Sequence, residues 1–153
     1  MKQIILMGHV FFGVLCILST VWLFVDVLNA REENLGRIRW MSRFVSLLMW
    51  LAFGIGGYWY VVHYKLDKAV ILKGPWPFSH NFFMESKEHF VIPLLLLATY
   101  LPMTVSRNLA FDKDARRLTL WIAALVALLA LFAEGNGAMI AMGVKVALQA
   151  QPH

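Results

Sequence analysis

The stretch Ile4–Val25, IILMGHVFFGVLCILSTVWLFV, contains no Asp, Glu, Lys or Arg residue. Because a helix rises about 1.5 Å per residue, about 20 apolar residues are enough to cross about 30 Å of hydrocarbon. Three further apolar blocks follow along the chain, and charged residues bound each of them. The sequence therefore predicts an all-α, integral membrane four-helix bundle that forms one domain over residues 1–153, with helices at about 4–28, 40–64, 81–106 and 117–148.

The composition supports a membrane protein rather than a soluble one. Hydrophobic residues make up 60% of the chain and charged residues only 15%, which is not the balance of an ordinary soluble domain. The net charge of +5 is assigned to the ends of membrane helices, since no cluster of Lys and Arg with interleaved polar residues suggests a nucleic-acid surface. The single cysteine, Cys16, excludes a disulfide framework and a four-cysteine metal site. We expect the lipid bilayer as a partner, and no nucleic acid.

Basic residues indicate how the helices are oriented. The loops after the first and third apolar blocks hold eight of the 14 basic residues, including every arginine: Arg31, Arg37, Arg39, Arg43, Arg107, Lys113, Arg116 and Arg117. The other side holds six lysines: Lys2, Lys65, Lys68, Lys73, Lys87 and Lys145. The positive-inside rule predicts that the arginine-bearing loops are cytoplasmic and both termini extracytoplasmic, with the bacterial cytoplasmic membrane as the expected location.

The connection Lys65–Phe78, between the second and third blocks, is the most distinctive one. It contains the apolar segment Ala69–Leu72, and two prolines flank Trp76 just beyond it. A tryptophan next to an apolar segment is typical of the membrane interface. Two placements are open, a lid over the outer end of the bundle or a loop that rests on the membrane surface.

Ionisable side chains recur at a similar depth in the predicted helices. Three of them lie 17 or 18 residues from the charged residue that closes the cytoplasmic end of their helix: His9, His89 and Glu134. That spacing places each of them about 25–27 Å from the cytoplasmic end. His63 lies up to one turn farther out, near the level of Glu85. Ionisable groups within a membrane span usually face the bundle interior and mark function, so the sequence predicts a site in the outer half.

Small residues and a proline accompany these side chains. Gly13 lies one turn from His9, and Glu134 belongs to a stripe of small residues at helical spacing, which is the face expected to pack inward. Pro93 follows His89 by four residues, and a proline inside a helix clashes with the carbonyl four residues before it. A kink there would free the His89 carbonyl and re-aim the imidazole.

Two imidazoles on facing helices predict one kind of occupant, a haem b group with two axial ligands. His9 or His63 would pair with His89, with glycines making room for the ring and outer lysines available to its propionates. The arrangement resembles, in outline, that of the small four-helix membrane cytochromes b. This resemblance implies electron transfer to or from quinone or an extracytoplasmic redox protein.

A carboxylate at the same depth favours another occupant, a directly bound metal ion. His9, His63, His89 and Glu134, with Glu85 as a further ligand, form a mixed nitrogen and oxygen set that suits iron, copper, zinc or manganese. The leading prediction is therefore a membrane redox protein that binds haem b or a non-haem metal. The sequence leaves open which of the two it is.

Two other functions are compatible with the same polar layer. Chains of His and Glu at membrane depth form proton relays in pumps and transporters. Alternatively, the layer is a hydrogen-bonded interface in a subunit that scaffolds a larger membrane complex.

Several polar residues are expected to have no part in the site. We expect Lys87 and Glu88 to face the lipid headgroups, and His80 and His153 to be solvated. Asp26 is expected to pair with Arg31 or Arg37, because it lies near the cytoplasmic interface.

Overall fold

A computed structural model describes residues 2–150, and this part of the chain consists of four α-helices with no strand. The helices are α1 (Lys2–Leu28), α2 (Leu35–Lys73), α3 (Glu85–Thr104) and α4 (Lys113–Gln149). The 3-10 helix η1 (Glu32–Asn34) precedes α2, and the π-helix η2 (Ser79–Met84) precedes α3. The prediction of an all-helical fold is confirmed for the described residues.

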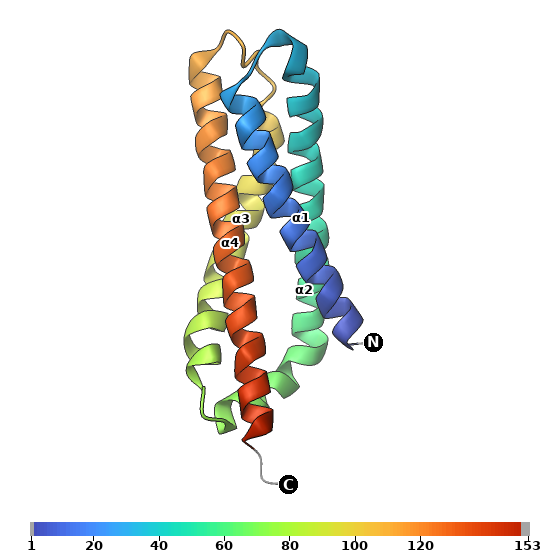
Figure 1. Ribbon diagram of the computed structural model, residues 1–153, viewed down its shortest axis with the longest axis vertical. Coiled ribbons are helices and arrows are strands. Elements are labelled where there is room, and N and C mark those ends of the chain that lie inside the picture. The colour runs from blue at the N-terminus through green and yellow to red at the C-terminus, as the bar shows by residue number, and fades with distance from the viewer. Residues whose placement is uncertain (1, 151–153) are drawn as a thin grey trace.

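The four helices lie side by side along the long axis of the molecule (Figure 1). α1 packs against α2 and α4, and α3 packs against the same two helices, which closes the bundle. The connections 29–34 and 105–112 lie at one end, here called the arginine end. α1 begins and α4 ends toward the opposite end, here called the lysine end.

Local sequence signals explain the helix boundaries at the arginine end. Arg37 donates two hydrogen bonds to Asp26, from Nε at 2.8 Å and from a terminal nitrogen at 2.6 Å, and so ties the start of α2 to the end of α1. The predicted pairing of Asp26 is thereby confirmed with Arg37. At the start of α4, the Asp112 carboxylate accepts a hydrogen bond from the amide of Ala115 at 2.9 Å, which is the usual role of an N-terminal capping residue.

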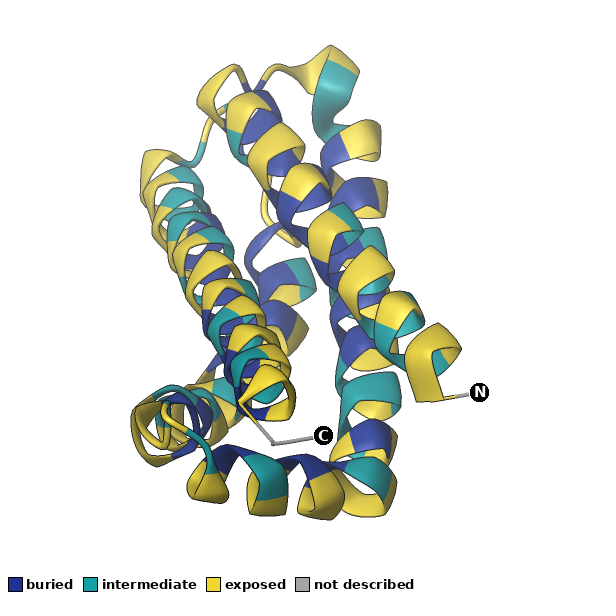
Figure 2. Ribbon diagram, turned by 60° about the horizontal axis from the view of Figure 1, so that its bottom comes forward, coloured by how far each residue is buried: buried dark blue, intermediate teal, exposed yellow. Residues whose placement is uncertain are grey.

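The second helix is longer than the sequence predicted. It continues past residue 64 through the segment Ala69–Leu72 and ends at Lys73, where Gly74 and Pro75 follow. Gly74 has an extended backbone, which is the conformation that a following proline favours. It also lies so close to α4 that a side chain there would overlap Ala147. The last turns of α2 pass across the lysine end of the bundle (Figure 2), so this segment is the lid rather than a surface loop.

Within residues 2–150, three segments are long and apolar enough to cross a bilayer: Lys2–Leu28, Glu32–Lys73 and Lys113–Gln149, with mean hydropathies of 2.3, 1.6 and 2.1. The fourth helix, α3, has 20 residues and does not reach this standard. Its first turn carries Glu85, Lys87 and Glu88, which lower the hydropathy of the whole helix.

The buried apolar residues form two clusters, one in each half of the bundle. The arginine-end core is the larger. It includes five fully buried residues: Cys16, Leu23, Val45, Leu101 and Val126. The lysine-end core consists of Trp59, Tyr64, Ile71, Met84 and Ile140. Large apolar side chains also point outward from α1, α2 and α4, among them Phe11, Val61 and Leu128, which are 61%, 78% and 62% exposed.

Candidate functional site

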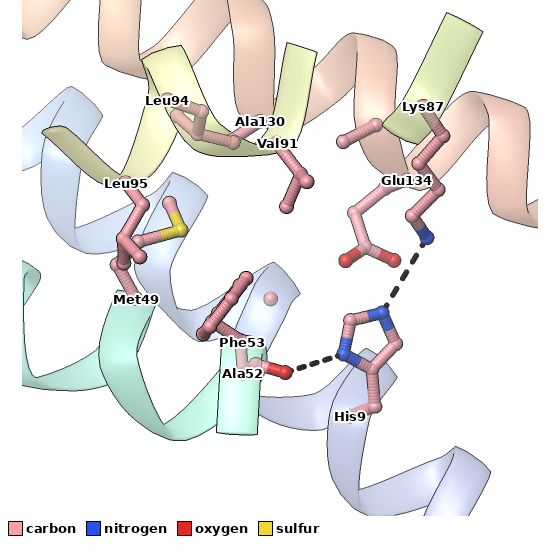
Figure 3. Close-up of a pocket in the computed structure, with 12 residues that line it drawn as sticks. His9, Met49, Ala52, Phe53, Lys87, Val91, Leu94, Leu95, Ala130 and Glu134 are labelled. Atoms are coloured by element: carbon pink, nitrogen blue, oxygen red, sulfur yellow. Dashed lines mark hydrogen bonds between the residues drawn. The ribbon is translucent and has the colours of Figure 1, made fainter. Parts of the chain in front are cut away.

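A small cavity lies against the arginine-end core, which contributes Met49, Leu94, Leu95, Ala130 and Ala133 to its lining. Its volume is about 40 Å³, more than the roughly 10–15 Å³ that a cavity needs to hold one water molecule. Three titratable side chains line it, and each comes from a different helix: His9 from α1, Lys87 from α3 and Glu134 from α4 (Figure 3). The remaining lining is apolar and includes Met49 and Phe53 of α2. The cavity therefore gathers three polar groups in otherwise apolar surroundings.

Glycines give these three side chains their space. Each polar side chain lies over a glycine of another helix, and the pairs are Gly13 with Glu134, Gly56 with His9, and Gly137 with Lys87. A Cβ added at Gly13 would overlap the Glu134 carboxylate, and one added at Gly56 would lie 2.6 Å from His9 Nδ1. Glycine is thus required at two positions by close approach rather than by backbone conformation, since no residue has a positive φ in the described part of the chain.

The hydrogen bond of His9 to α2 defines the state of its ring. His9 Nδ1 lies 2.8 Å from the carbonyl oxygen of Ala52. A carbonyl can only accept, so Nδ1 carries the proton and donates it. In the neutral ring Nε2 then has a free lone pair, and Lys87 Nζ lies 3.5 Å from it, at the long limit of a hydrogen bond. His9 is therefore placed to accept a proton from Lys87.

The Glu134 carboxylate faces the same cavity as the Lys87 ammonium group (Figure 3). The two groups do not form an ion pair within 4.0 Å, since the salt bridges among residues 2–150 are Lys2–Asp67 and Arg37–Asp26. With His9 neutral, the positive Lys87 and the negative Glu134 balance each other. Any additional proton would leave the cavity with a net positive charge.

His89 does not share this cavity, in contrast to the position expected from its depth. It is exposed, and its Nδ1 lies 2.6 Å from the carbonyl oxygen of Glu85 in its own helix. The reason is the helical period. His89 follows Lys87 by two residues, which is about 200° of rotation, so that Lys87 points inward and His89 points away.

The other two predicted ligands also lie outside the cavity. His63 is half-buried, stacks edge-on against Tyr58 at 6.3 Å, and follows the cavity residue Ala52 by 11 residues, which is about 16 Å along the helix. Glu85 is exposed in the first turn of α3. Within residues 2–150 no three His, Cys, Asp or Glu side chains are grouped closely enough to hold a metal ion. Of the five candidate ligands, the structure brings together His9 and Glu134.

Lys87 is the member of the site that the sequence analysis missed, because we expected it to face the headgroups. A signal for its inward position was present. Lys87 precedes Val91, Leu94, Leu95 and Ala98 by 4, 7, 8 and 11 residues, which is the spacing of one helix face. Leu94, Leu95 and Ala98 are buried, so the same face carries Lys87 into the bundle.

A second polar contact lies between α2 and η2 at the lysine end. His80 is buried, although the sequence predicted it to be solvated, and its Nδ1 lies 2.9 Å from the Tyr64 hydroxyl group. The cause is η2, which begins directly before His80 and carries it against α2. Burial lowers the pKa of His80, Lys68 lowers it further, and Glu85 and Glu88 act in the opposite direction. His153, also expected to be solvated, lies outside the described residues.

Comparison with known proteins finds no protein-family model, no curated protein and no solved structure that matches this chain. The chemistry of His9, Lys87 and Glu134, and the bundle that holds them, are the features that bear on its function.

Proposed function

We propose that this chain is an integral membrane protein whose four helices hold a proton-exchanging site, formed by His9, Lys87 and Glu134. Membrane insertion is supported by the apolar outer surface, on which large side chains of α1, α2 and α4 are exposed. Exposed apolar area of this extent is expected where lipid covers it. α3 crosses as the fourth helix, because its Lys87 points into the bundle and not toward lipid.

The arginine end faces the cytoplasm in this proposal. The eight basic residues of that end lie in or beside the connections 29–34 and 105–112, which are adjacent in the fold. Because Lys87 lies in the cavity, the six lysines of the other side become five flanking residues (6 − 1), and the bias increases to eight against five. The positive-inside rule then puts the lysine end on the extracytoplasmic side.

The observation that carries the proton-exchange proposal is the environment of His9 Nε2. The hydrogen bond from Nδ1 to Ala52 leaves Nε2 as an acceptor, 3.5 Å from Lys87 Nζ. Transfer of one proton from Nζ to Nε2 would leave a neutral amine and an imidazolium ion, and the Glu134 carboxylate across the cavity would stabilise either cation. The three groups can thus pass a proton among themselves without a change in net charge.

Proton uptake from water is the second half of this function. The titratable residues that line the cavity are His9 from α1, Lys87 from α3 and Glu134 from α4, while α2 contributes no titratable side chain. A single water molecule fits the volume of about 40 Å³ and would bridge groups that do not touch directly. Protonation of Glu134 or His9 then adds one positive charge to an apolar environment, which couples proton binding to helix packing or to a partner protein.

Infrared difference spectra between buffers of low and high pH test this proposal. We expect a band of a protonated carboxylic acid that titrates in the reconstituted protein and disappears in Glu134→Gln. Glu85→Gln removes an exposed carboxylate of α3 and serves as the matched control, in which the band stays. If the Glu134→Gln spectrum equals that of the unmodified protein across the pH range, Glu134 does not exchange protons and the proposal is wrong.

The haem- or metal-based redox function stays a prediction. Three features of the geometry favour proton exchange over it: His89 points away from His9, the cavity is of water size rather than porphyrin size, and the Lys87 ammonium group lies where a metal cation would approach His9 Nε2. An absorption spectrum and elemental analysis of purified protein test the prediction. A haem Soret band that disappears in His89→Ala, or bound metal lost in His9→Ala, would put the redox function first.

A scaffold role in a larger membrane complex predicts a different effect of substitutions at the same residues. If the polar layer only holds helices together, Glu134→Gln should weaken assembly. If it exchanges protons, Glu134→Gln should abolish proton-coupled activity and leave assembly intact, because glutamine keeps the shape of the side chain.

A further inference from the structure

Buried hydroxyl groups in the arginine half of the bundle are satisfied within their own helices. Thr20, Ser42, Thr104 and Thr119 each donate to a backbone carbonyl three or four residues earlier, at 2.7 to 2.9 Å. Such bonds need no partner helix and no water. Cys16 of α1 donates across to the carbonyl oxygen of Val45 in α2 at 3.6 Å. Among residues 2–150, this half therefore has no fully buried side-chain nitrogen or oxygen atom that lacks a partner.

Buried polar atoms in the lysine half are different. Three buried side-chain atoms lack a hydrogen-bond partner within residues 2–150: Trp59 Nε1, Ser79 Oγ and Asn136 Nδ2. Their residues are 9%, 0% and 3% exposed, and they belong to α2, η2 and α4 respectively. Buried polar groups in proteins are nearly always paired, with protein or with ordered water. A water molecule that entered this half would find a hydrogen-bond partner at each of these three groups.

These three groups lie on α2, α4 and η2, which contact one another at the lysine end. Asn136 follows Glu134 by two residues and belongs to the buried stripe of α4 that continues through Ile140 and Gly143. Trp59 belongs to the same buried cluster as Ile140. Ser79 lies directly over Gly143, seven residues or about 10 Å beyond Asn136 toward the lysine end.

The opposite direction along α4 is closed by apolar side chains. Between Glu134 and the arginine end, the buried residues of α4 include Ala130, Val126 and Ala123, and Leu94, Leu95 and Ala98 of α3 belong to the same cluster. A water molecule needs two to four polar partners. The polar side chains of α1 in this layer, Cys16 and Thr20, already donate to the carbonyl oxygens of Val45 and Cys16.

We propose that water reaches the His9–Lys87–Glu134 cavity from the lysine end, along Asn136, Trp59 and Ser79, and that the arginine end is sealed. The site is then a half-channel that exchanges protons with one compartment. This inference rests on the proposed function, which it completes by naming the side from which the proton arrives.

Cysteine labelling tests the route with a matched pair of positions. Asn136 lies 13 residues before the end of α4 (149 − 136) and Val126 lies 13 residues after its start (126 − 113), and both are buried, at 3% and 0% exposure. The variants Asn136→Cys and Val126→Cys are made in a Cys16→Ala background and reconstituted in sealed vesicles. A charged, membrane-impermeant methanethiosulfonate is then added on each side in turn.

We expect the Asn136→Cys variant to react from the lysine side at least tenfold faster than the Val126→Cys variant reacts from either side. Equal rates, or reaction of Asn136→Cys only from the arginine side, would overturn the route. If the variants do not fold, the unmodified chain still gives an answer by exchange in deuterium oxide. The Trp59 indole N–H, assigned with Trp59→Phe, should exchange before the backbone amide of Val126, and the reverse order would overturn the route.

The proton-exchange proposal and the half-channel proposal can be disproved independently of each other. A protein whose Glu134 titrates while the Asn136→Cys variant stays unreactive keeps proton exchange and loses the half-channel. A protein whose Asn136→Cys variant reacts while Glu134 does not titrate has a water-filled entrance and no proton site.

Discussion

The arginine half and the lysine half of this bundle use the same four helices but treat buried polar groups in opposite ways. In the arginine half, buried hydroxyl groups bond to their own helices. The contacts that cross between helices there, from Cys16 to Val45 and from Arg37 to Asp26, join groups that are all paired. In the lysine half, polar groups meet across helices, as His9 does with Ala52 and Tyr64 with His80, or have no partner at all. The first half holds the helices together, and the second is where chemistry is possible.

The difference also explains why the site lies where it does. A charge buried away from water is costly unless it has a counter-charge and polar partners, so Lys87 and Glu134 need each other and a cavity that holds polar groups. Both conditions are met in the cavity, where Gly13, Gly56 and Gly137 leave room for side chains of other helices.

The largest expected effect comes from removal of one charge in the lysine half. Glu134→Ala leaves Lys87 without its counter-charge, and we expect the free energy of unfolding in detergent to fall by about 2–3 kcal/mol. The double variant Lys87→Met/Glu134→Leu should recover most of this loss, because it removes both charges. Glu85→Ala, on the exposed face of α3, is the control and should have little effect. Equal stability of Glu134→Ala and Glu85→Ala would show that the two halves do not differ in this way.

Gly13→Ala should have the next largest effect. The added methyl group overlaps the Glu134 carboxylate, which must move out of the cavity, and overpacking of this kind costs about 1–3 kcal/mol. Gly57→Ala is the matched control, since nothing lies within 4 Å of its added Cβ and alanine favours a helix. Thermal unfolding measures the cost, and the Glu134 infrared band reports the displacement. If both glycine variants behave alike, Gly13 does not shape the site.

The change in stability on Asn136→Leu should be smaller, and it shows whether water occupies the lysine half. Asn136→Leu in a dry lysine half would remove an unsatisfied donor and stabilise the fold by about 1–3 kcal/mol. In the water-filled half proposed above, we expect a change of less than about 1 kcal/mol and slower proton exchange at Glu134. Thr119→Val is the counterpart in the arginine half, where it loses one hydrogen bond within its own helix, worth about 1 kcal/mol, and should leave proton exchange unchanged.

The smallest effect is a pH dependence of stability from His80. Because burial lowers the pKa of His80 below its usual 6.5, the unfolded chain binds a proton at pH values where the folded chain does not. Stability should therefore fall as the pH decreases below 6.5, until the lowered pKa is reached, and should not depend on His80 above that range. Unfolding midpoints of the unmodified protein and of His80→Gln, measured across this range, test it. A larger pH dependence in His80→Gln than in the unmodified protein would contradict the assignment.

The sequence predicted the position of a residue along its helix axis better than the face of the helix on which its side chain lies. Apolar runs placed α1 and α4 to within a few residues, and counting from flanking charges brought His9 and Glu134 to the same level. The count carries no information on rotation, so it also included His89, which points away two residues after Lys87. The end of α2 was missed because Lys65, Asp67 and Lys68 resemble a loop at a membrane boundary, whereas only Gly74 and Pro75 stop the helix.

Infrared spectra of the unmodified protein in deuterium oxide test the central claim most directly, because each half contains one reporter. At a pH where Glu134 is protonated, its carboxylic acid band reports on the lysine half. The S–H band of Cys16, the single cysteine and 0% exposed, reports on the arginine half. We expect the Glu134 band to shift at once on transfer to deuterium oxide while the Cys16 band stays. Exchange of both groups at the same rate, or of Cys16 before Glu134, would contradict the account.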